Sequence, residues 1–313
     1  MELLGVPFDL CGYRPGARLG PAAMRLAGLQ EAMAAIGHEV IDQGDIQVLG
    51  PDHEPGLRNF NAAHHAYAQI FARVSSALRS QRVPIVIGGD HSLSIGSVGA
   101  AVNHFEGDVA LLWIDAHADL NSPGTSPSGN LHGMPLACLM HSPSEVEGPA
   151  DAQWKQLQRD FAPHRLQPER VGWIGLRDVD YGERKRLATM GHDYVSTMYD
   201  IDRHGLVSEI ARFDAWLRQS GARHLWISFD VDSLDPFLAP GTGTAVRGGL
   251  TYREMHLLGE MLCELRDAND CPYKLVGLDV VETNPLFDSN NATAKTGVEW
   301  ICSVFGKTIL GSR

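Results

Sequence analysis

The chain has 313 residues, of which 44% are apolar, and its 38 acidic against 26 basic residues give a formal charge of −12 with the histidines neutral. This length allows an extensive hydrophobic core and excludes a miniprotein that depends on disulfides. The acidic excess, without any Lys/Arg-rich run, argues against nucleic-acid and anionic-membrane surfaces, because both need clustered positive charge. A small cationic ligand fits this charge better.

Short apolar runs of strand length alternate with amphipathic stretches along the chain. The expected strands are Leu3–Phe8, His38–Ile46, Val83–Ile87, Val109–Ile114, Val171–Leu176, His192–Ser196, His224–Phe229 and Lys274–Val280. The expected helices are Ala22–Ile36, Ala62–Ser80, Leu206–Gln219, Tyr252–Leu265 and Ala294–Phe305. This alternation predicts α/β architecture: one domain over residues 1–313, with a mainly parallel sheet of about eight strands covered by helices on both faces.

Four segments rich in Gly, Pro, Ser or acidic residues are expected to be loops: Gly50–Gly56, Asn121–Leu131, Ser142–Gln153 and Ser233–Gly249. No apolar stretch approaches the roughly 20 residues needed to cross a bilayer, and no signal-peptide pattern opens the chain. Five scattered cysteines without a CxxC pair indicate reduced thiols. We therefore expect a cytoplasmic protein that has no membrane or nucleic-acid partner.

The carboxyl ends of the predicted strands are the candidate ligand sites, because ligands of open parallel sheets bind beyond these ends. The strand Val109–Ile114 runs directly into Asp115-Ala-His117-Ala-Asp119. In an extended backbone these three polar side chains share one face, so three potential metal ligands converge. A loop with solvated carboxylates is the alternative, but crowding two acids around a histidine is costly without a cation.

Two further strand ends carry similar residues. Asp230 and Asp232 follow Leu225–Phe229 and fall on one face, although this pair alone would also fit an exposed turn. His91 follows the run Pro84-Ile-Val-Ile-Gly-Gly-Asp90, whose glycines allow close approach of the backbone. Four carboxylates and two imidazoles would balance two divalent cations better than one. An oxygen-rich set with some imidazole suits Mn²⁺, and a pair of such ions indicates hydrolysis by an activated water.

Three segments, GGDHS at 88–92, DAHAD at 115–119 and SFDVDSLDP at 228–236, resemble the signatures of the ureohydrolases, the family of arginase and agmatinase. The resemblance spans nearly the whole chain and includes GLDVVETNP at 277–285. It implies a three-layer α/β/α sandwich and two Mn²⁺ ions. By the same resemblance the first ion is held by His91, Asp115, Asp119 and Asp230, and the second by Asp115, His117, Asp230 and Asp232.

The resemblance also implies a reaction in which a metal-bridging hydroxide attacks the guanidinium carbon and releases urea and an amine. Asp119 would hydrogen-bond the hydroxide, His132 would shuttle a proton to the leaving amine, and Glu282 would orient the guanidinium. Taken alone, Glu282 could equally belong to a structural salt bridge. Thr244 would shape the same pocket.

Within the family, the segment SGNLHG at 128–133 and the loop before it resemble the arginase pattern. Asn121 and Ser128 would then bind the substrate α-carboxylate, assisted by Ser126 and Asn130, although an ordinary polar loop is the alternative reading of these residues. The segment GLRDVDYGE at 175–183 is also similar, and implies that Asp180 and Glu183 contact the α-ammonium. Together these contacts favour L-arginine over agmatine, which lacks the carboxylate.

The leading hypothesis is thus a manganese hydrolase that converts L-arginine to L-ornithine and urea, working as a homo-oligomer, a trimer or hexamer by the resemblance. One rival is another guanidino hydrolase, an agmatinase or guanidinobutyrase. A second is a zinc-dependent deacetylase of related fold, which needs a tandem histidine in the site; His64-His65 lies in a different context. A non-enzymatic arginine-binding protein is the third.

Overall fold

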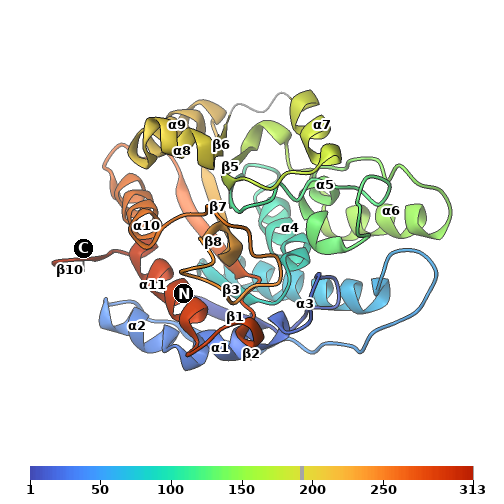
Figure 1. Ribbon diagram of the computed structural model, residues 1–313, viewed down its shortest axis with the longest axis horizontal. Helices are drawn as coiled ribbons and strands as arrows, with labels where there is room; N and C mark the ends of the chain where they lie inside the picture. The colour runs from blue at the N-terminus through green and yellow to red at the C-terminus, as the bar shows by residue number, and fades with distance from the viewer. Residues whose placement is uncertain (191–193, 313) are drawn as a thin grey trace.

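The computed structural model describes residues 1–190 and 194–312, which form three layers with a twisted sheet in the middle (Figure 1). The main sheet holds eight parallel strands in the order β2-β1-β3-β8-β7-β4-β5-β6. Their bounds are β1 (Glu2–Val6), β2 (Ile41–Asp45), β3 (Pro84–Gly88), β4 (Ala110–Ile114), β5 (Val171–Leu176), β6 (Val195–Thr197), β7 (His224–Asp230) and β8 (Lys274–Val281). The predicted α/β sandwich with its parallel sheet is confirmed.

Helices cover both faces of this sheet, as Figure 1 shows. One face carries α1 (Gly20–Leu26), α2 (Leu29–Ala35), α8 (Met198–His204), α9 (Leu206–Ser220), α10 (Tyr252–Asp267) and α11 (Ala292–Val304). The other carries α3 (Phe60–Arg79), α4 (Ser94–His104), α5 (Pro135–Leu139) and α6 (Pro149–Phe161), while α7 (Tyr181–Thr189) follows β5. Two separate hydrophobic cores result, one against each face of the sheet, and β3, β4 and β5 are buried along their whole length.

Several predicted elements differ from the structure in their bounds. The single helix expected at Ala22–Ile36 is two helices, because Gly28 adopts a left-handed conformation with φ 82° and separates α1 from α2. The expected loop Ser142–Gln153 contains the start of α6, where Pro149 occupies the first turn. The strand expected at His192–Ser196 begins at Val195, and residues 192 and 193 lie outside the described residues.

Helix α4 was not among the predicted helices, and its burial explains why. Nine of its eleven residues are buried, so it shows no polar face from which an amphipathic period could be recognised. The described part of the chain ends in a short hairpin of β9 (Lys307–Thr308) and β10 (Gly311–Ser312). No helix in the described part of the chain combines the length and apolarity that a membrane span requires.

The sheet brings four polar strand ends together. Strands β3, β8, β7 and β4 are consecutive neighbours in the middle of the sheet. Their register is level, since Ile87 pairs with Val280, Val280 with Phe229, and Phe229 with Ile114. The residues that follow these positions therefore emerge at the same carboxyl edge, where parallel sheets bind ligands.

Candidate metal centre and its pocket

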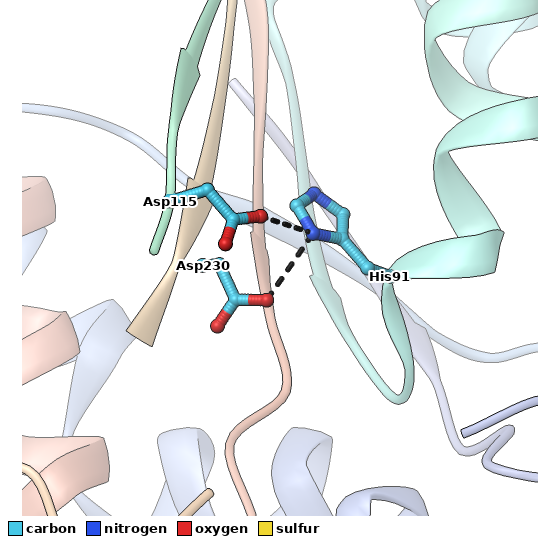
Figure 2. Close-up of side chains that lie close together, drawn as sticks. All are labelled: His91, Asp115 and Asp230. Atoms are coloured by element: carbon cyan, nitrogen blue, oxygen red, sulfur yellow. Dashed lines mark ion pairs between the residues drawn. The ribbon is translucent and has the colours of Figure 1, made fainter. Parts of the chain in front are cut away.

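Three side chains from three strand ends converge on one point, as Figure 2 shows. His91 comes from the turn after β3, Asp115 from the end of β4, and Asp230 from the end of β7. His91 Nδ1 lies 3.0 Å from an oxygen of Asp115 and 3.2 Å from an oxygen of Asp230. A carboxylate oxygen of Asp119 lies 3.1 Å from the same nitrogen. All four side chains are buried.

A second group shares Asp115 with the first. His117 Nδ1 lies 3.3 Å from the other oxygen of Asp115 and 3.2 Å from an oxygen of Asp232. The ligand atoms of these three residues are mutually within 4.8 Å, as are those of His91, Asp115 and Asp230. Alternation along the chain therefore brings these side chains together, as expected for Asp115, His117 and Asp119 and for Asp230 and Asp232. The six predicted metal ligands lie side by side in two overlapping groups.

The geometry of the first group fits a cation. His91 Nδ1 is surrounded by three carboxylate oxygens, but a single N–H group can donate a well-aligned hydrogen bond to only one of them. Accordingly, His91 Nδ1 and one buried oxygen of Asp115 have no hydrogen-bond partner among the described residues. Buried polar atoms are seldom left in this state, and a bound ion is one of the accepted explanations. The donor set, mostly carboxylate with some imidazole, suits a divalent ion such as Mn²⁺.

Hydrogen bonds behind His91 fix its tautomer. Ser228 Oγ donates to one carboxylate oxygen of Asp279, and the other oxygen accepts hydrogen bonds from Ser97 Oγ and Trp226 Nε1. Because the Ser228 proton is engaged in this way, Ser228 Oγ accepts from His91 Nε2 at 2.8 Å. Nε2 therefore carries a proton, so the neutral form of the ring has its lone pair on Nδ1, as a metal ligand requires. Ser228 and Asp279 were not among the predicted site residues.

The electrostatics of the site show the same need for positive charge. Burial raises the pKa of Asp230 well above its ordinary value, and the neighbouring carboxylates of Asp232 and Asp115 raise it further. Burial and Asp115 likewise raise the pKa of Asp119 to about 6. Burial would lower the pKa of His91, but its carboxylate neighbours raise it well above the ordinary value. In the absence of a cation, protons take its place, so metal binding should release them.

Two of the site residues hold a strained backbone. Asp119 has φ 51° and Glu282 has φ 61°, in the left-handed region that non-glycine residues rarely occupy. Such strain is concentrated at functional sites, where the surrounding structure imposes it. Glu282 is held in place because its backbone N–H donates to Gly89 O at 2.8 Å, and its Oε1 accepts from the His91 N–H at 3.0 Å.

Through His132, Glu282 also connects the strand ends to the loop 121–131, which is called the substrate loop after its predicted role. His132 Nδ1 lies 3.0 Å from Glu282 Oε1, and both side chains are buried or nearly so. Burial alone would lower the pKa of His132, but the hydrogen bond and charge of Glu282 raise it to about 9. With Nδ1 engaged by Glu282, Nε2 is the ring nitrogen that is available for proton transfer.

A cavity of about 210 Å³ opens over the metal ligands. Its lining on the metal side includes His91, His117, Asp119, Asp230 and Asp232, together with His132. On the outer side it is lined by Asn121, Ser126, Ser128, Asp180, Glu183 and Thr244, all of which were predicted to contact substrate. The volume and the mixture of neutral and acidic groups fit a small, polar, cationic molecule.

The outer residues are connected to one another. Asn121 Nδ2 donates to Asp180 Oδ2 at 2.7 Å. Asp180 and Glu183 form a reciprocal capping box at the start of α7, in which each carboxylate accepts the backbone N–H of the other residue. Burial, followed by the charge of Asp119, raises the pKa of Glu183 to about 8. Thr244 Oγ1 donates to Asp232 Oδ2 at 2.7 Å and so supports a metal ligand as well as the pocket wall.

Asn130 lies differently from the other predicted substrate residues. Within the part of the chain that the structure describes, it does not line the cavity. Its side chain is buried, and Oδ1 accepts a hydrogen bond from Arg58 Nη1 at 2.6 Å. Asn130 therefore fixes the end of the substrate loop against Arg58.

Arg177 is a further residue of the site that the sequence did not single out. Its guanidinium donates to the backbone oxygens of Gly175, Asp232, Ser233, Leu234 and Val246 at 2.5–3.3 Å. It thereby holds the short 3₁₀ helix Val231–Ser233, which carries Asp232, against the end of β5. An arginine whose partners are mostly backbone oxygens from distant segments leaves no local pattern, so only the fold reveals it.

Comparison with known proteins agrees with these observations. A family model described as "Arginase family" matches residues 1–306. The chain belongs to the arginase family. The arginase of Staphylococcus aureus (strain MRSA252) is 38% identical over 317 residues, covering 99% of this chain and 98% of that protein.

Solved structures are similar over the same length. The native structure of arginase from Bacillus caldovelox at pH 5.6 matches with a TM-score of 0.87 and 37% identity, over 98% of both chains. A crystal structure of arginase from Bacillus subtilis subsp. subtilis str. 168 matches with a TM-score of 0.86 and 37% identity, over 99% of both chains. The fold predicted from the resemblance is thus the fold of its relatives.

The rival deacetylase hypothesis finds no support in the position of the tandem histidine. His64 and His65 lie on α3, where His64 Nε2 is 2.9 Å from Asp160 Oδ2 and the ring contacts Phe60 and Phe161. Neither histidine lines the cavity within the described residues.

Proposed function

We propose that this protein is a binuclear manganese hydrolase that converts L-arginine to L-ornithine and urea. The observation that carries the proposal is the position of His91 Nδ1, a buried ring nitrogen surrounded by three carboxylates at the floor of a polar cavity. The first ion would be held by His91, Asp115, Asp119 and Asp230, and the second by Asp115, His117, Asp230 and Asp232. When bound, two such ions lower the pKa of a shared water and make hydroxide available near neutral pH.

The side chains of the outer rim would bind the amino-acid head group. Asn121, Ser126 and Ser128 offer neutral donors to the α-carboxylate, and the Asp180 carboxylate faces the α-ammonium. Glu183, which forms the capping box with Asp180, would support Asp180 in this contact. Asn130, which bonds Arg58, would support this loop rather than touch the substrate. Because agmatine has no carboxylate, it would leave the neutral donors unpaired, so the rim should discriminate against it.

His132 and Glu282 would handle the leaving group. Glu282 lies between His91 and His132, where its carboxylate can orient a guanidinium by charge. His132, kept protonated by Glu282, can donate its Nε2 proton to the departing amine. General acid catalysis of this kind contributes a factor of about 10² to 10⁴. Asp119 would accept a hydrogen bond from the nucleophile.

Two predictions about the context of the protein belong to this proposal, namely a cytoplasmic location and a homo-oligomer of three or six chains. Several large apolar side chains are exposed, among them Leu26, Phe237, Ile309 and Leu310, and burial of some of them against another copy would be favourable. Light scattering during size-exclusion chromatography will give the number of chains.

The decisive experiment is urea release by the purified protein loaded with Mn²⁺, with L-arginine, agmatine and 4-guanidinobutyrate compared side by side. We expect a strong preference for L-arginine. Turnover of agmatine or guanidinobutyrate instead would retain the hydrolytic centre and refute the assignment of the rim. Inactivity toward all three compounds would refute the proposed function.

A further inference from the structure

A network of hydrogen bonds links the substrate loop to the start of α7, and Thr125 stands at its centre. Thr125 Oγ1 lies 2.9 Å from Asn121 Oδ1 and accepts the Ser122 backbone N–H at 2.9 Å. Asn121 in turn donates through Nδ2 to Asp180 Oδ2. The two residues proposed to hold the amino-acid head group are therefore connected to each other and to Thr125, which has no assigned role.

The direction of these hydrogen bonds follows from the donors available. Ser122 Oγ donates to the Glu145 carboxylate, which can only accept, so the Ser122 proton is engaged. The nearest acceptor for the Thr125 proton is then Asn121 Oδ1, at 2.9 Å, compared with 3.4 Å for the Ser122 carbonyl. Among residues 1–190 and 194–312, no other donor reaches Asn121 Oδ1.

These partners fix the orientation of the Asn121 amide. Its nitrogen must face the Asp180 carboxylate and its oxygen must face the Thr125 hydroxyl, while the side chain is only 5% exposed and lines the cavity. We infer that Thr125 determines specificity as a positioning residue: it holds the Asn121 amide so that an N–H, and not the carbonyl oxygen, is offered to the substrate α-carboxylate. This inference rests on the proposed function and extends it.

The packing around the pair is close enough to enforce this orientation. Gly182, at the second position of α7, lies directly opposite. A Cβ atom added there would meet Asn121 Oδ1 at 2.9 Å and Thr125 Cβ at 3.0 Å. Any side chain at this position would therefore press on the same amide oxygen that Thr125 holds.

Thr125→Val tests the inference, because valine keeps the shape of threonine and removes the hydroxyl. The Asn121 oxygen then loses its donor, and the amide is held only by its hydrogen bond to Asp180, so it can move away from the orientation that offers an N–H to the substrate α-carboxylate. We expect KM for L-arginine and the Kd of L-ornithine to rise about tenfold, which corresponds to one buried hydrogen bond, with kcat and metal content unchanged. Calorimetry with putrescine, which lacks the carboxylate, should show no change.

Three further variants separate positioning from a general structural effect. Thr125→Ser keeps the hydroxyl and should restore the wild-type values. Thr189→Val removes an exposed hydroxyl of α7 that bonds only its own helix, and should change nothing. In an Asn121→Ala background, Thr125→Val should have no additional effect on KM, because it acts through Asn121.

The possible outcomes distinguish this inference from the proposed function. If Thr125→Val is folded and binds L-ornithine as the wild type does, the inference is wrong and the function stands. If the wild type neither hydrolyses L-arginine nor binds L-ornithine, both are wrong. Should Thr125→Val fail to fold, Gly182→Ala tests the same contact: it should raise KM for L-arginine with kcat retained, and an unchanged KM would overturn the inference.

Discussion

The metal centre and the substrate rim adjoin each other at one edge of the sheet, but they are held in place by different means. The ligands of the metal centre follow central strands whose register is level, and most of them are fully buried. The rim combines the loop 121–131 with Asp180 and Glu183 at the start of α7, its groups are held by hydrogen bonds between side chains, and Ser128 in the loop is exposed. The backbone thus places the candidate metal ligands, whereas individual hydrogen bonds place the groups proposed to select the substrate.

This difference predicts separable consequences of mutation. Changes at the strand ends should alter metal content and rate while the fold persists, because the sheet does not depend on these polar side chains. Changes in the rim should alter KM and leave the metal in place. The experiments below test that separation, beginning with the largest expected effect.

Asp230→Asn should abolish the metal centre. The amide can still accept the Asp232 N–H, which Asp230 accepts at 2.7 Å, so the local turn should persist. The variant loses a carboxylate shared by both ions, and we expect metal affinity to fall by about 100-fold or more, with activity falling alongside it. Elemental analysis should find fewer than two ions per chain.

The metal-free protein provides the control for Asp230→Asn. Without a cation, burial and two neighbouring carboxylates already raise the pKa of Asp230, so a neutral amide should leave the melting temperature unchanged or raise it. The stabilisation by added Mn²⁺ should be lost. Retention of two ions per chain would contradict the assignment of this ligand.

His132→Asn should reduce kcat by about 10² to 10⁴-fold, since it removes the proposed proton donor. Metal content and the affinity for L-ornithine should be retained, because neither depends on the imidazole. His65→Asn on α3, remote from the cavity, is the matched control. A rate close to that of the wild type would remove His132 from the mechanism.

Arg177→Gln tests a connection between the two regions. Loss of the guanidinium leaves backbone oxygens from five residues without their charged donor. We expect the free energy of unfolding to fall by about 3 kcal/mol or more, and metal affinity to weaken because Asp232 lies on the segment that Arg177 holds. Arg184→Gln, at an exposed position of α7, removes the same charge and should change neither quantity.

The convergence of the candidate metal ligands could be predicted from the sequence for a physical reason. Asp115, His117 and Asp119 alternate directly after an apolar strand, and both the period of two and the strand end can be recognised in a single segment. The same holds for Asp230 and Asp232. His91 was found because its strand end resembled the others.

The residues that sequence reasoning missed depend on contacts between distant segments. Arg177 binds backbone oxygens some 55 to 69 positions away, and Asp279 reaches His91 through Ser228. The prediction for Asn130 rests on its motif, which gives no sign of its partner Arg58, 72 positions away. No local pattern encodes such partners, because they exist only when the sheet order is known.

The pair of His132 and Glu282 joins the two regions, since His132 follows the loop 121–131 and Glu282 follows β8. The pH dependence of this pair is the smallest of the effects predicted for the two regions. Glu282 raises the pKa of His132 from its ordinary value to about 9. The pair therefore stabilises the folded protein fully below about pH 6.5, the unfolded value, and this stabilisation is lost as the pH rises through 9. We expect it to contribute about 3 kcal/mol at pH 6, because each unit of difference between the folded and unfolded pKa corresponds to about 1.4 kcal/mol.

Denaturant unfolding of the metal-free wild type and of Glu282→Gln, at several pH values from 6 to 10, measures this contribution. Glutamine can still accept the His91 N–H, so the difference between the two proteins reports the charge on Glu282. The difference should be largest at pH 6 and should vanish by pH 10, and a difference that is independent of pH would show that the two side chains are not coupled. Bound cations would also attract the negative charge of Glu282. Loading with Mn²⁺ should therefore reduce the difference in unfolding free energy between the two proteins at pH 6. The size of this reduction measures how strongly the metal centre influences the rim.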